Sequence, residues 1–223
     1  MTSTLRPQLA ILLSGSGSNL QSFINAINAG VLKADIAVVI SNKAGVLGLK
    51  RANDAGIKTL TIDNLQFKNR EEFDSALALS IKDHKPDLLV LAGFMRILTQ
   101  RFVESFSGRI LNIHPSLLPK YPGLDTHKKA IDAGDAIAGA TVHFVTAKLD
   151  GGPPVLQVEV PIHQNDSPEK LASRILEKEH QIYPLVVQWF CEGRLTFAKG
   201  SAYLDSVALP KNGFTFTGDT IDK

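Results

Sequence analysis

LAILLSGSGSNL, the stretch from Leu9 to Leu20, joins a short apolar run to a glycine-rich turn. Five aliphatic residues in a row are typical of a strand that is buried on both faces, as in a parallel sheet. The turn Ser14–Asn19 then leads into a run with helical spacing. The stretch therefore predicts a strand, a tight turn and a helix, which is the repeating unit of α/β folds.

The same alternation continues along the chain beyond this unit. Aliphatic runs of strand length alternate with amphipathic stretches, which implies parallel strands joined by right-handed crossovers. We therefore predict an α/β fold with a doubly wound, mostly parallel sheet flanked by helices. The predicted strands are Leu9–Leu13, Ile36–Ile40, Ile57–Ile62, Leu88–Leu91 and Ile110–Ile113, and the predicted helices are Asn19–Ala29, Leu47–Ala55, Arg70–Asp83 and Thr99–Ser105.

The rhythm changes after about Pro115, and the C-terminal part is predicted to be antiparallel. A loop rich in proline and glycine comes first, and two strands are later separated by the turn-rich stretch LDGGPP. Ser167 is the expected N-cap of a last long helix that ends at about Cys191. The other elements predicted here are a short helix at Thr126–Ala133 and strands at Thr141–Thr146 and Val155–Val160.

Bulk properties indicate one ordinary globular domain. We predict a single domain over residues 1–223, with a core at about 8–205 and a polar tail that frays from about 211. A net charge of +2 does not favour nucleic acid as a partner, and no apolar run approaches the roughly 20 residues of a membrane span. Cys191 is the only cysteine, which suits a reducing compartment, and we expect a cytoplasmic protein.

The turn Ser14–Asn19 has the composition of an anion cradle. Glycines let the backbone approach a phosphate, and the free N–H groups of the helix start favour negative charge. Only Gly15 and Gly17 fit the dinucleotide fingerprint, because Leu20 stands where a third glycine is required, and no lysine follows to make a P-loop. A phosphate monoester is the ligand that fits best. A tight turn with a Ser or Asn cap explains the same residues without any ligand.

Asn112 and His114 stand where the fifth predicted strand runs into a loop. Ligands of open α/β sheets bind at the carboxyl ends of strands, and residues two apart in a strand project to the same side. A carboxamide and an imidazole in that position could stabilise an oxyanion on a carbonyl carbon under attack. The alternative is a purely structural pair. No nucleophile motif is present, so the chemistry would be direct attack by a substrate group.

Asp150 precedes a Gly-Gly pair and offers a carboxylate at a turn. If it lies near His114, it could favour the protonated imidazole or hold a water that relays protons. An aspartate in this position is also a common turn former, and the residues alone leave both interpretations open.

Taken together, these segments resemble the folate-dependent phosphoribosylglycinamide formyltransferases, a family of the formyltransferase superfamily that acts in purine synthesis. The resemblance covers roughly residues 8–205, with its segments in family order. The segments that carry it are SGSGSNL at Ser14–Leu20, SNKAGVLGL at Ser41–Leu49, LAGFMRIL at Leu91–Leu98, LNIHPSLLPKYPGL at Leu111–Leu124, VHFVTAKLDGGP at Val142–Pro153 and EHQIYPLV at Glu179–Val186.

The resemblance implies a set of roles for individual residues. Asn112, His114 and Asp150 would be catalytic at the formyl carbon, with His114 as general acid. The co-substrate would be 10-formyltetrahydrofolate, with no metal. Phosphoribosylglycinamide would be bound by Gly17, Ser18, Asn19 and Glu179, and the folate by Arg70, Met95, Arg96, Ile97, Leu98 and Asn112.

Without the resemblance, several of these residues have simpler interpretations. Glu179 would be placed on a solvated helix face, and core packing would be expected of Met95, Ile97 and Leu98. His143, inside a strand, would be a core histidine with its hydrogen bonds satisfied, and we leave it in a supporting role. The partners implied are small-molecule substrates, with no nucleic acid and no membrane, for a monomer or weak homodimer.

Other functions remain open at this point. A formyltetrahydrofolate deformylase would use the same trio with water as nucleophile, but that family has an additional N-terminal domain. A methionyl-tRNA formyltransferase would have an additional C-terminal RNA-binding domain, and the roughly 30 residues after the last helix show no basic stripe. A non-catalytic nucleotide-binding module would use only the cradle at Gly15–Asn19.

Overall fold

The structure is a computed structural model that describes residues 6–218 and 221–222. The chain forms two compact units, the first ending at Leu111 and the second beginning at Asn112. The predicted single domain remains a prediction. The predicted fold class is confirmed, because mostly parallel strands flanked by helices are accompanied by an antiparallel C-terminal part. No helix among the described residues is long and apolar enough to cross a membrane.

The first unit is built on parallel strands in the order β4-β1-β2-β3. Strands β1 and β4 are almost completely buried, which explains why their sequences are continuous aliphatic runs. The strands are β1 (Gln8–Leu13), β2 (Asp35–Ser41), β3 (Thr59–Thr61) and β4 (Leu88–Leu91), and β5 (Ile110–His114) contains the division between the units.

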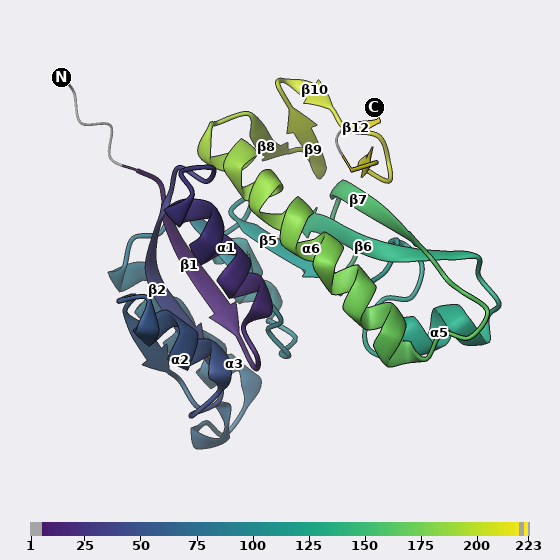
Figure 1. The fold of residues 1–223 in the computed structure, drawn as a ribbon. Helices are drawn as coiled ribbons and strands as arrows, with labels where there is room; N and C mark the ends of the chain where they lie inside the picture. Colours follow the sequence, from purple (N-terminus) through teal and green to yellow (C-terminus); the bar gives the residue numbers. More distant parts are fainter. Residues whose placement is uncertain (1–5, 219–220, 223) are drawn as a thin grey trace. The chain divides into compact units, whose positions relative to one another are not determined.

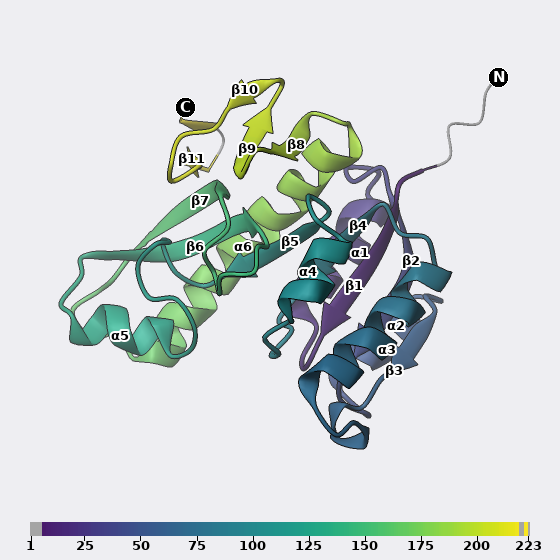
Figure 2. The ribbon, with the colours of Figure 1, turned by 180° about the vertical axis from the view of Figure 1, so that it is seen from behind.

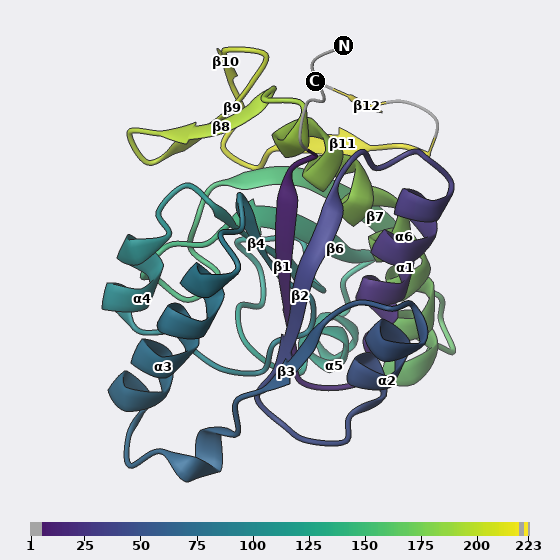
Figure 3. The ribbon, with the colours of Figure 1, turned by 90° about the vertical axis from the view of Figure 1, so that its left-hand side faces the viewer.

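Helices cover both faces of these strands, as a doubly wound arrangement requires. Figure 3 shows α1 and α2 on one side of β1 and β2, with α3 and α4 on the other. The face that carries α3 and α4 is seen in Figure 2. Asn69 caps α3, because its side-chain oxygen accepts from the Glu72 N–H at 2.8 Å. The helices are α1 (Ser18–Asn28), α2 (Leu47–Asp54), η1 (Asn64–Gln66), α3 (Arg70–Asp83) and α4 (Gln100–Ser105).

The second unit is built on the antiparallel pair β6 (Ile137–Phe144) and β7 (Pro154–Pro161). The long helix α6 (Pro168–Cys191) lies across this pair, as Figure 1 shows, and packs its apolar face on both strands. The predicted cap is confirmed, since the Ser167 hydroxyl accepts from the Lys170 N–H at 3.3 Å. A shorter helix, α5 (Thr126–Asp132), also contacts α6.

Strand β6 starts four residues earlier than predicted and ends two residues earlier, so the prediction of Thr141–Thr146 is wrong at both ends. Three of the first four residues of β6 are alanine or glycine, which carry little strand signal. Gly139 has a packing reason to be there: a Cβ at this position would lie 1.9 Å from the Val158 carbonyl oxygen of β7.

The chain after α6 forms short strands that the sequence analysis did not predict. A small antiparallel sheet contains β8 (Leu195–Ala198), β9 (Ser201–Leu204) and β10 (Val207–Ala208). The prediction of a fraying tail from about residue 211 is wrong for β11 (Phe214–Phe216), which pairs in parallel with β7 and buries Phe214. Strand β12 (Ile221–Asp222) pairs with β11.

Candidate active site

His114 is the last residue of β5 and is held at both of its ring nitrogens. Its Nε2 lies 2.9 Å from the backbone carbonyl oxygen of Tyr121. A carbonyl oxygen can only accept, so Nε2 carries a hydrogen and donates it. Tyr121 has a left-handed backbone conformation, with φ of 54°, which turns its carbonyl toward the ring. The loop after β5 therefore fixes both the orientation and the Nε2 hydrogen of His114.

The other ring nitrogen faces a carboxylate. Nδ1 of His114 lies 3.5 Å from Oδ2 of Asp150, and the two side chains are only 7% and 9% exposed. Asp150 has a φ of 47°, so it is the turn former that its Gly-Gly neighbours suggested. The same oxygen accepts from the Gly123 N–H at 2.8 Å. Burial strengthens the interaction between the carboxylate and the ring, because water screens them little.

Asn112 points into the same cluster and contacts a second histidine. Its Nδ2 lies 3.1 Å from Nε2 of His143, whose Nδ1 lies 2.9 Å from the Phe144 carbonyl oxygen. That carbonyl must accept, so the hydrogen of a neutral His143 is on Nδ1 and its Nε2 is the acceptor for the Asn112 amide. Nε2 of His143 also lies 3.9 Å from Oδ1 of Asp150.

His143 is held in its neutral form by its surroundings. Burial lowers the pKa of His143 from its usual 6.5 to about 4, against the opposing effects of the Phe144 carbonyl and Asp150, while His114 lowers it further. Near neutral pH the ring is therefore uncharged and can accept the hydrogen bond from Asn112. The structure thus gathers Asn112, His114 and Asp150 around one buried cluster in the second unit.

The cluster has the groups that acyl transfer requires. One amide N–H of Asn112 is used by His143, which leaves the second for a negatively charged oxygen. His114 can exchange a proton at Nδ1, where Asp150 provides the counter-charge. Among the described residues no group of three or more histidine, cysteine, aspartate or glutamate side chains is arranged to hold a metal ion.

The glycine-rich turn of the first unit is shaped by close backbone contacts. Gly17 is the N-cap of α1 with φ of 68°, and no side chain caps the helix. A Cβ on Gly17 would lie 2.5 Å from Cα of Gly48, whose N–H donates to the Gly15 carbonyl at 3.0 Å. The turn thus packs against the start of α2. Ser18 and Asn19 begin α1, and Asn19 is buried.

The loop expected to bind folate begins beside this turn within the first unit. The backbone N–H of Ser14 donates to the Gly93 carbonyl at 3.1 Å, and the Ser14 hydroxyl accepts from the Met95 N–H at 2.8 Å. Core packing is the wrong interpretation for Met95 and Ile97, which are 65% and 53% exposed, whereas Leu98 is buried. Exposed apolar side chains beside a polar turn are suited to the flat face of an aromatic ligand.

Three charged residues named in the sequence analysis lie in different surroundings. Arg96 stacks over the Phe73 ring at 5.5 Å, and its Nε is buried without a hydrogen-bond partner among the described residues. Arg70 begins α3 and is exposed. Glu179 is 6% exposed on α6, so a solvated helix face is the wrong interpretation for it.

Sequence reasoning gave His143 only a supporting role and did not identify the partners of the trio. The Tyr121 carbonyl and the Gly123 N–H are backbone groups, which no side-chain pattern can reveal. For His143 a signal existed: a histidine near the end of a strand that is otherwise apolar must have its ring nitrogens satisfied.

Comparison with known proteins gives consistent matches. The formyl transferase family matches residues 7–187. The phosphoribosylglycinamide formyltransferase of Escherichia coli (strain K12) is 49% identical over 92% of this chain and 97% of its own. That of Haemophilus influenzae is 51% identical over 93% and 98%.

Solved structures agree with these matches. A phosphoribosylglycinamide formyltransferase from Coxiella burnetii has a TM-score of 0.91 and 46% identity, covering 95% of this chain and 99% of its own. A formyltetrahydrofolate deformylase from Pseudomonas syringae has a TM-score of 0.83 at 24% identity, covering 91% and 67%. At that identity the likeness to the deformylase shows the shared fold alone.

Proposed function

Because this chain belongs to the formyl transferase family, we propose that it transfers the formyl group of 10-formyltetrahydrofolate to the amine of 5'-phosphoribosylglycinamide, a step of de novo purine (IMP) biosynthesis. The observation that carries this proposal is the buried pair of His114 and Asp150, with Asn112 in the same cluster and held by its hydrogen bond to His143. This cluster offers a donor for an oxyanion and a group that can exchange a proton, as acyl transfer requires.

The proposed reaction is direct transfer through a tetrahedral intermediate. The neutral amine attacks the formyl carbon, and the formyl oxygen becomes an oxyanion that accepts from the Asn112 amide and from Nδ1 of protonated His114. The bond between the formyl carbon and N10 of the folate then breaks. The amine loses one proton and N10 gains one, so the protons balance. Because Nε2 of His114 is engaged by the Tyr121 carbonyl, its proton exchange takes place at Nδ1.

The binding roles of the remaining residues are proposals as well. The backbone of Gly17, Ser18 and Asn19 would bind the substrate phosphate at the start of α1, where the helix N-terminus favours anions. Glu179 would hold the glycinamide amine through its carboxylate. The folate would contact Arg70, Met95, Arg96, Ile97, Leu98 and Asn112, and the exposure of Met95 and Ile97 supports a ligand surface there.

The proposed setting is the cytoplasm, where the protein would act on small molecules as a monomer or weak homodimer, without nucleic acid or a membrane. Cys191 is the single cysteine of the sequence, so the chain has no internal disulfide, which suits a reducing compartment. Size-exclusion chromatography with light scattering across a tenfold concentration range tests the proposed assembly.

The decisive experiment is an absorbance assay of folate release with three acceptors compared side by side. Rapid turnover with glycinamide ribonucleotide, and little with water or with formylatable tRNA, is the expected result. Equally rapid turnover with water as the only acceptor would identify a deformylase. If the protein binds glycinamide ribonucleotide but shows no turnover with any of the three acceptors, it is a non-catalytic nucleotide-binding module.

A further inference from the structure

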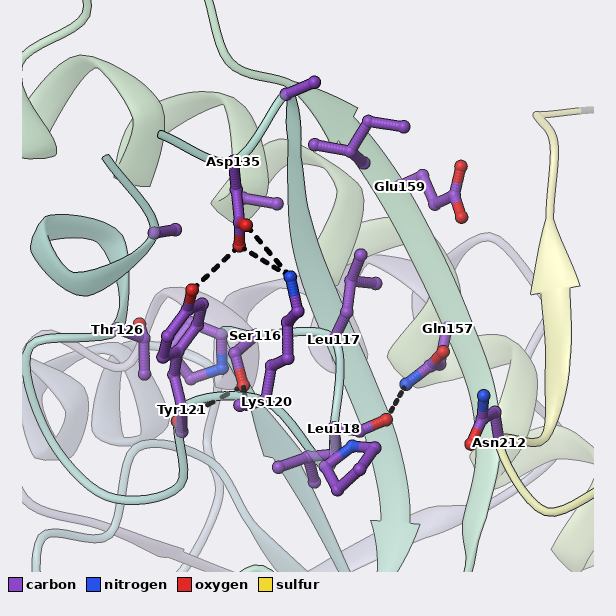
Figure 4. A pocket seen from close by; sticks show the side chains of 16 residues that line it. Ser116, Leu117, Leu118, Lys120, Tyr121, Thr126, Asp135, Gln157, Glu159 and Asn212 are labelled. Atoms are coloured by element: carbon purple, nitrogen blue, oxygen red, sulfur yellow. Dashed lines mark hydrogen bonds and ion pairs between the residues drawn. The ribbon is translucent and has the colours of Figure 1, made fainter. Parts of the chain in front are cut away.

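A cavity of about 520 Å³ lies behind the loop that carries the His114 partner, and it contains a cluster of polar side chains that the proposed mechanism does not use. All of its lining residues belong to the second unit. Figure 4 shows Lys120 and Tyr121 pointing from the loop toward Asp135, which follows α5.

Asp135 binds both of these neighbours at once. Its carboxylate oxygens accept from the Lys120 ammonium at 2.9 and 3.0 Å, and Oδ2 also accepts from the Tyr121 hydroxyl at 2.9 Å. These hydrogen bonds hold the pKa of the Asp135 carboxyl below its usual range, and the bond from Lys120 has a larger effect than the bond from Tyr121. Asp135 is therefore a charged acceptor with two donors from adjacent loop residues.

Backbone hydrogen bonds fix the segment that contains Asp135. Its N–H donates to the Ala130 carbonyl of α5 at 3.1 Å, and the next residue, Ala136, accepts from the Ile162 N–H at 2.9 Å. Asp135 is thus fixed to both α5 and the end of β7. A carboxylate in such a position can hold a loop in place, because its own backbone cannot follow the loop if the loop moves.

Lys120 and Tyr121, the two residues that Asp135 binds, determine the position of the carbonyl that accepts from His114. Tyr121 combines the side-chain bond to Asp135 with the backbone carbonyl that His114 Nε2 contacts at 2.9 Å. Its φ of 54° is unfavourable for a residue with a Cβ, so neighbouring contacts must maintain it. The Ser116 hydroxyl adds a bond to the Lys120 carbonyl at 2.7 Å.

We propose that Asp135 is a positioning residue for His114, which holds Lys120 and Tyr121 so that the Tyr121 carbonyl accepts the Nε2 hydrogen. In catalytic terms this inference rests on the proposed function. Without the tether, the carbonyl would no longer be fixed opposite Nε2. The Asp150 carboxylate beside Nδ1 would then draw the ring hydrogen of neutral His114 to Nδ1. The ring would lose both its orientation and its Nε2 hydrogen.

The test is Asp135→Ala in the full chain, read by ¹⁵N chemical shifts of the His114 ring and by steady-state kinetics. We expect the Nε2–H form of neutral His114 to decrease and kcat to fall by about 10- to 100-fold, since small misplacements of a reacting group have effects of this size. Both KM values should stay within about twofold, because Asp135 is proposed to act on the ring and not on substrate binding. Asp135→Asn keeps an acceptor for the Tyr121 hydroxyl and should show a smaller change in both readouts.

Asp132→Asn is the matched control. Asp132 accepts from the Lys128 ammonium one helical turn away on α5, so it is a second Asp–Lys pair without a link to Tyr121. It should leave the His114 spectrum and kcat unchanged. A change in this control as large as that of Asp135→Ala would overturn the proposal.

Further outcomes keep the test decisive. An unchanged His114 spectrum in folded Asp135→Ala would overturn the proposal, whatever happens to kcat. If that variant does not fold, Tyr121→Phe removes only the hydroxyl bond and keeps the carbonyl, and the same shift is expected on a smaller scale. An unchanged spectrum in Tyr121→Phe would then overturn it. The ring spectrum needs no substrate, so a failure of the proposed function would be recognised separately from a failure of this one.

Discussion

Nδ2 of Asn112 lies 3.1 Å from Nε2 of His143, and this contact fixes which way the Asn112 carboxamide faces. Nε2 of neutral His143 is an acceptor because its Nδ1 donates to the Phe144 carbonyl. The amide therefore presents one N–H to His143 and has one to offer a ligand. A flipped amide would place two acceptors against each other, so the histidine excludes that orientation.

The first prediction concerns the donor that this orientation makes available. Asn112→Ala should lower kcat by about 10²- to 10³-fold, since loss of one oxyanion donor has an effect of this size. Steady-state kinetics with both substrates are the measurement, and circular dichroism should show that the fold is retained. Near-normal turnover in the folded variant would remove Asn112 from the mechanism.

The second prediction concerns the neutral state of His143. Its pKa in the folded protein is about 4, against 6.5 when unfolded, so the unfolded chain binds the proton more readily between these values. The contribution of neutral His143 to the free energy of unfolding is fully present above about pH 6.5 and is lost as the pH falls toward 4. At about 1.4 kcal/mol per pKa unit, the lowering of the pKa from 6.5 to about 4 corresponds to about 3–4 kcal/mol.

His143→Gln should remove this dependence while keeping a side chain that can accept from Asn112. Urea unfolding of both proteins between pH 7.5 and 4.5 is the measurement. We expect the free energy of unfolding of the wild-type protein to fall more steeply with acidification than that of the variant. Parallel curves for the two proteins would show that His143 is not held neutral.

Most of the fold was predictable because its signals are local. The buried strands are uninterrupted aliphatic runs, and α6 begins at a Ser cap followed by Pro168, both of which can be read from neighbouring residues. Strand β11 was not predictable in this way. It has three residues, and its order depends on Phe214 packing and pairing beside β7, more than 50 positions earlier in the chain.

The candidate site was predictable only as far as side chains at strand ends and turns reveal it. Asn112, His114 and Asp150 could be named because polar residues stood at a strand end and at a turn. The groups that hold these side chains could not be named. They are the Tyr121 carbonyl and the Gly123 N–H, which are backbone groups and leave no mark in the side-chain pattern. Their positions follow from loop conformation, which depends on contacts distant in sequence.

The third prediction isolates the charge of Asp150. Asn can occupy the left-handed turn position with φ of 47° and can still accept from the Gly123 N–H, so Asp150→Asn should fold normally. Without the carboxylate, the protonated His114 ring loses its counter-charge 3.5 Å away. We therefore expect kcat to fall throughout the pH range, by about 10²-fold or more, since a well-positioned proton donor contributes about 10²- to 10⁴-fold.

The measurement for Asp150→Asn is kcat across the pH range in which the wild-type protein stays folded. The Lys50–Asp54 pair on α2 offers a control, because Asp54→Asn also removes the carboxylate of a charge pair, but on an exposed helix face. Its pH profile should match that of the wild type. If the Asp150→Asn profile matches as well, the carboxylate has no part in the proton exchange.

The fourth prediction separates the two interpretations of the glycine-rich turn. Gly17→Ala introduces a Cβ that would lie 2.5 Å from Cα of Gly48, at a residue with φ of 68°. The strained backbone alone costs about 1–3 kcal/mol, and the clash adds to it, so the melting temperature should fall. Gly15→Ala is the matched control, since no heavy atom lies within 4 Å of its added Cβ.

Kinetics then decide whether the turn also binds phosphate. Displacing the backbone at Gly17 moves the N–H groups at the start of α1, which a phosphate would need. In the fraction that remains folded, the KM for glycinamide ribonucleotide should rise at least about tenfold, because each 1.4 kcal/mol of lost binding corresponds to a factor of ten. The KM for the folate should stay near its wild-type value, because the phosphate belongs to the other substrate. A lower melting temperature with both KM values unchanged would mean that the turn is structural only, and that the phosphate is bound elsewhere.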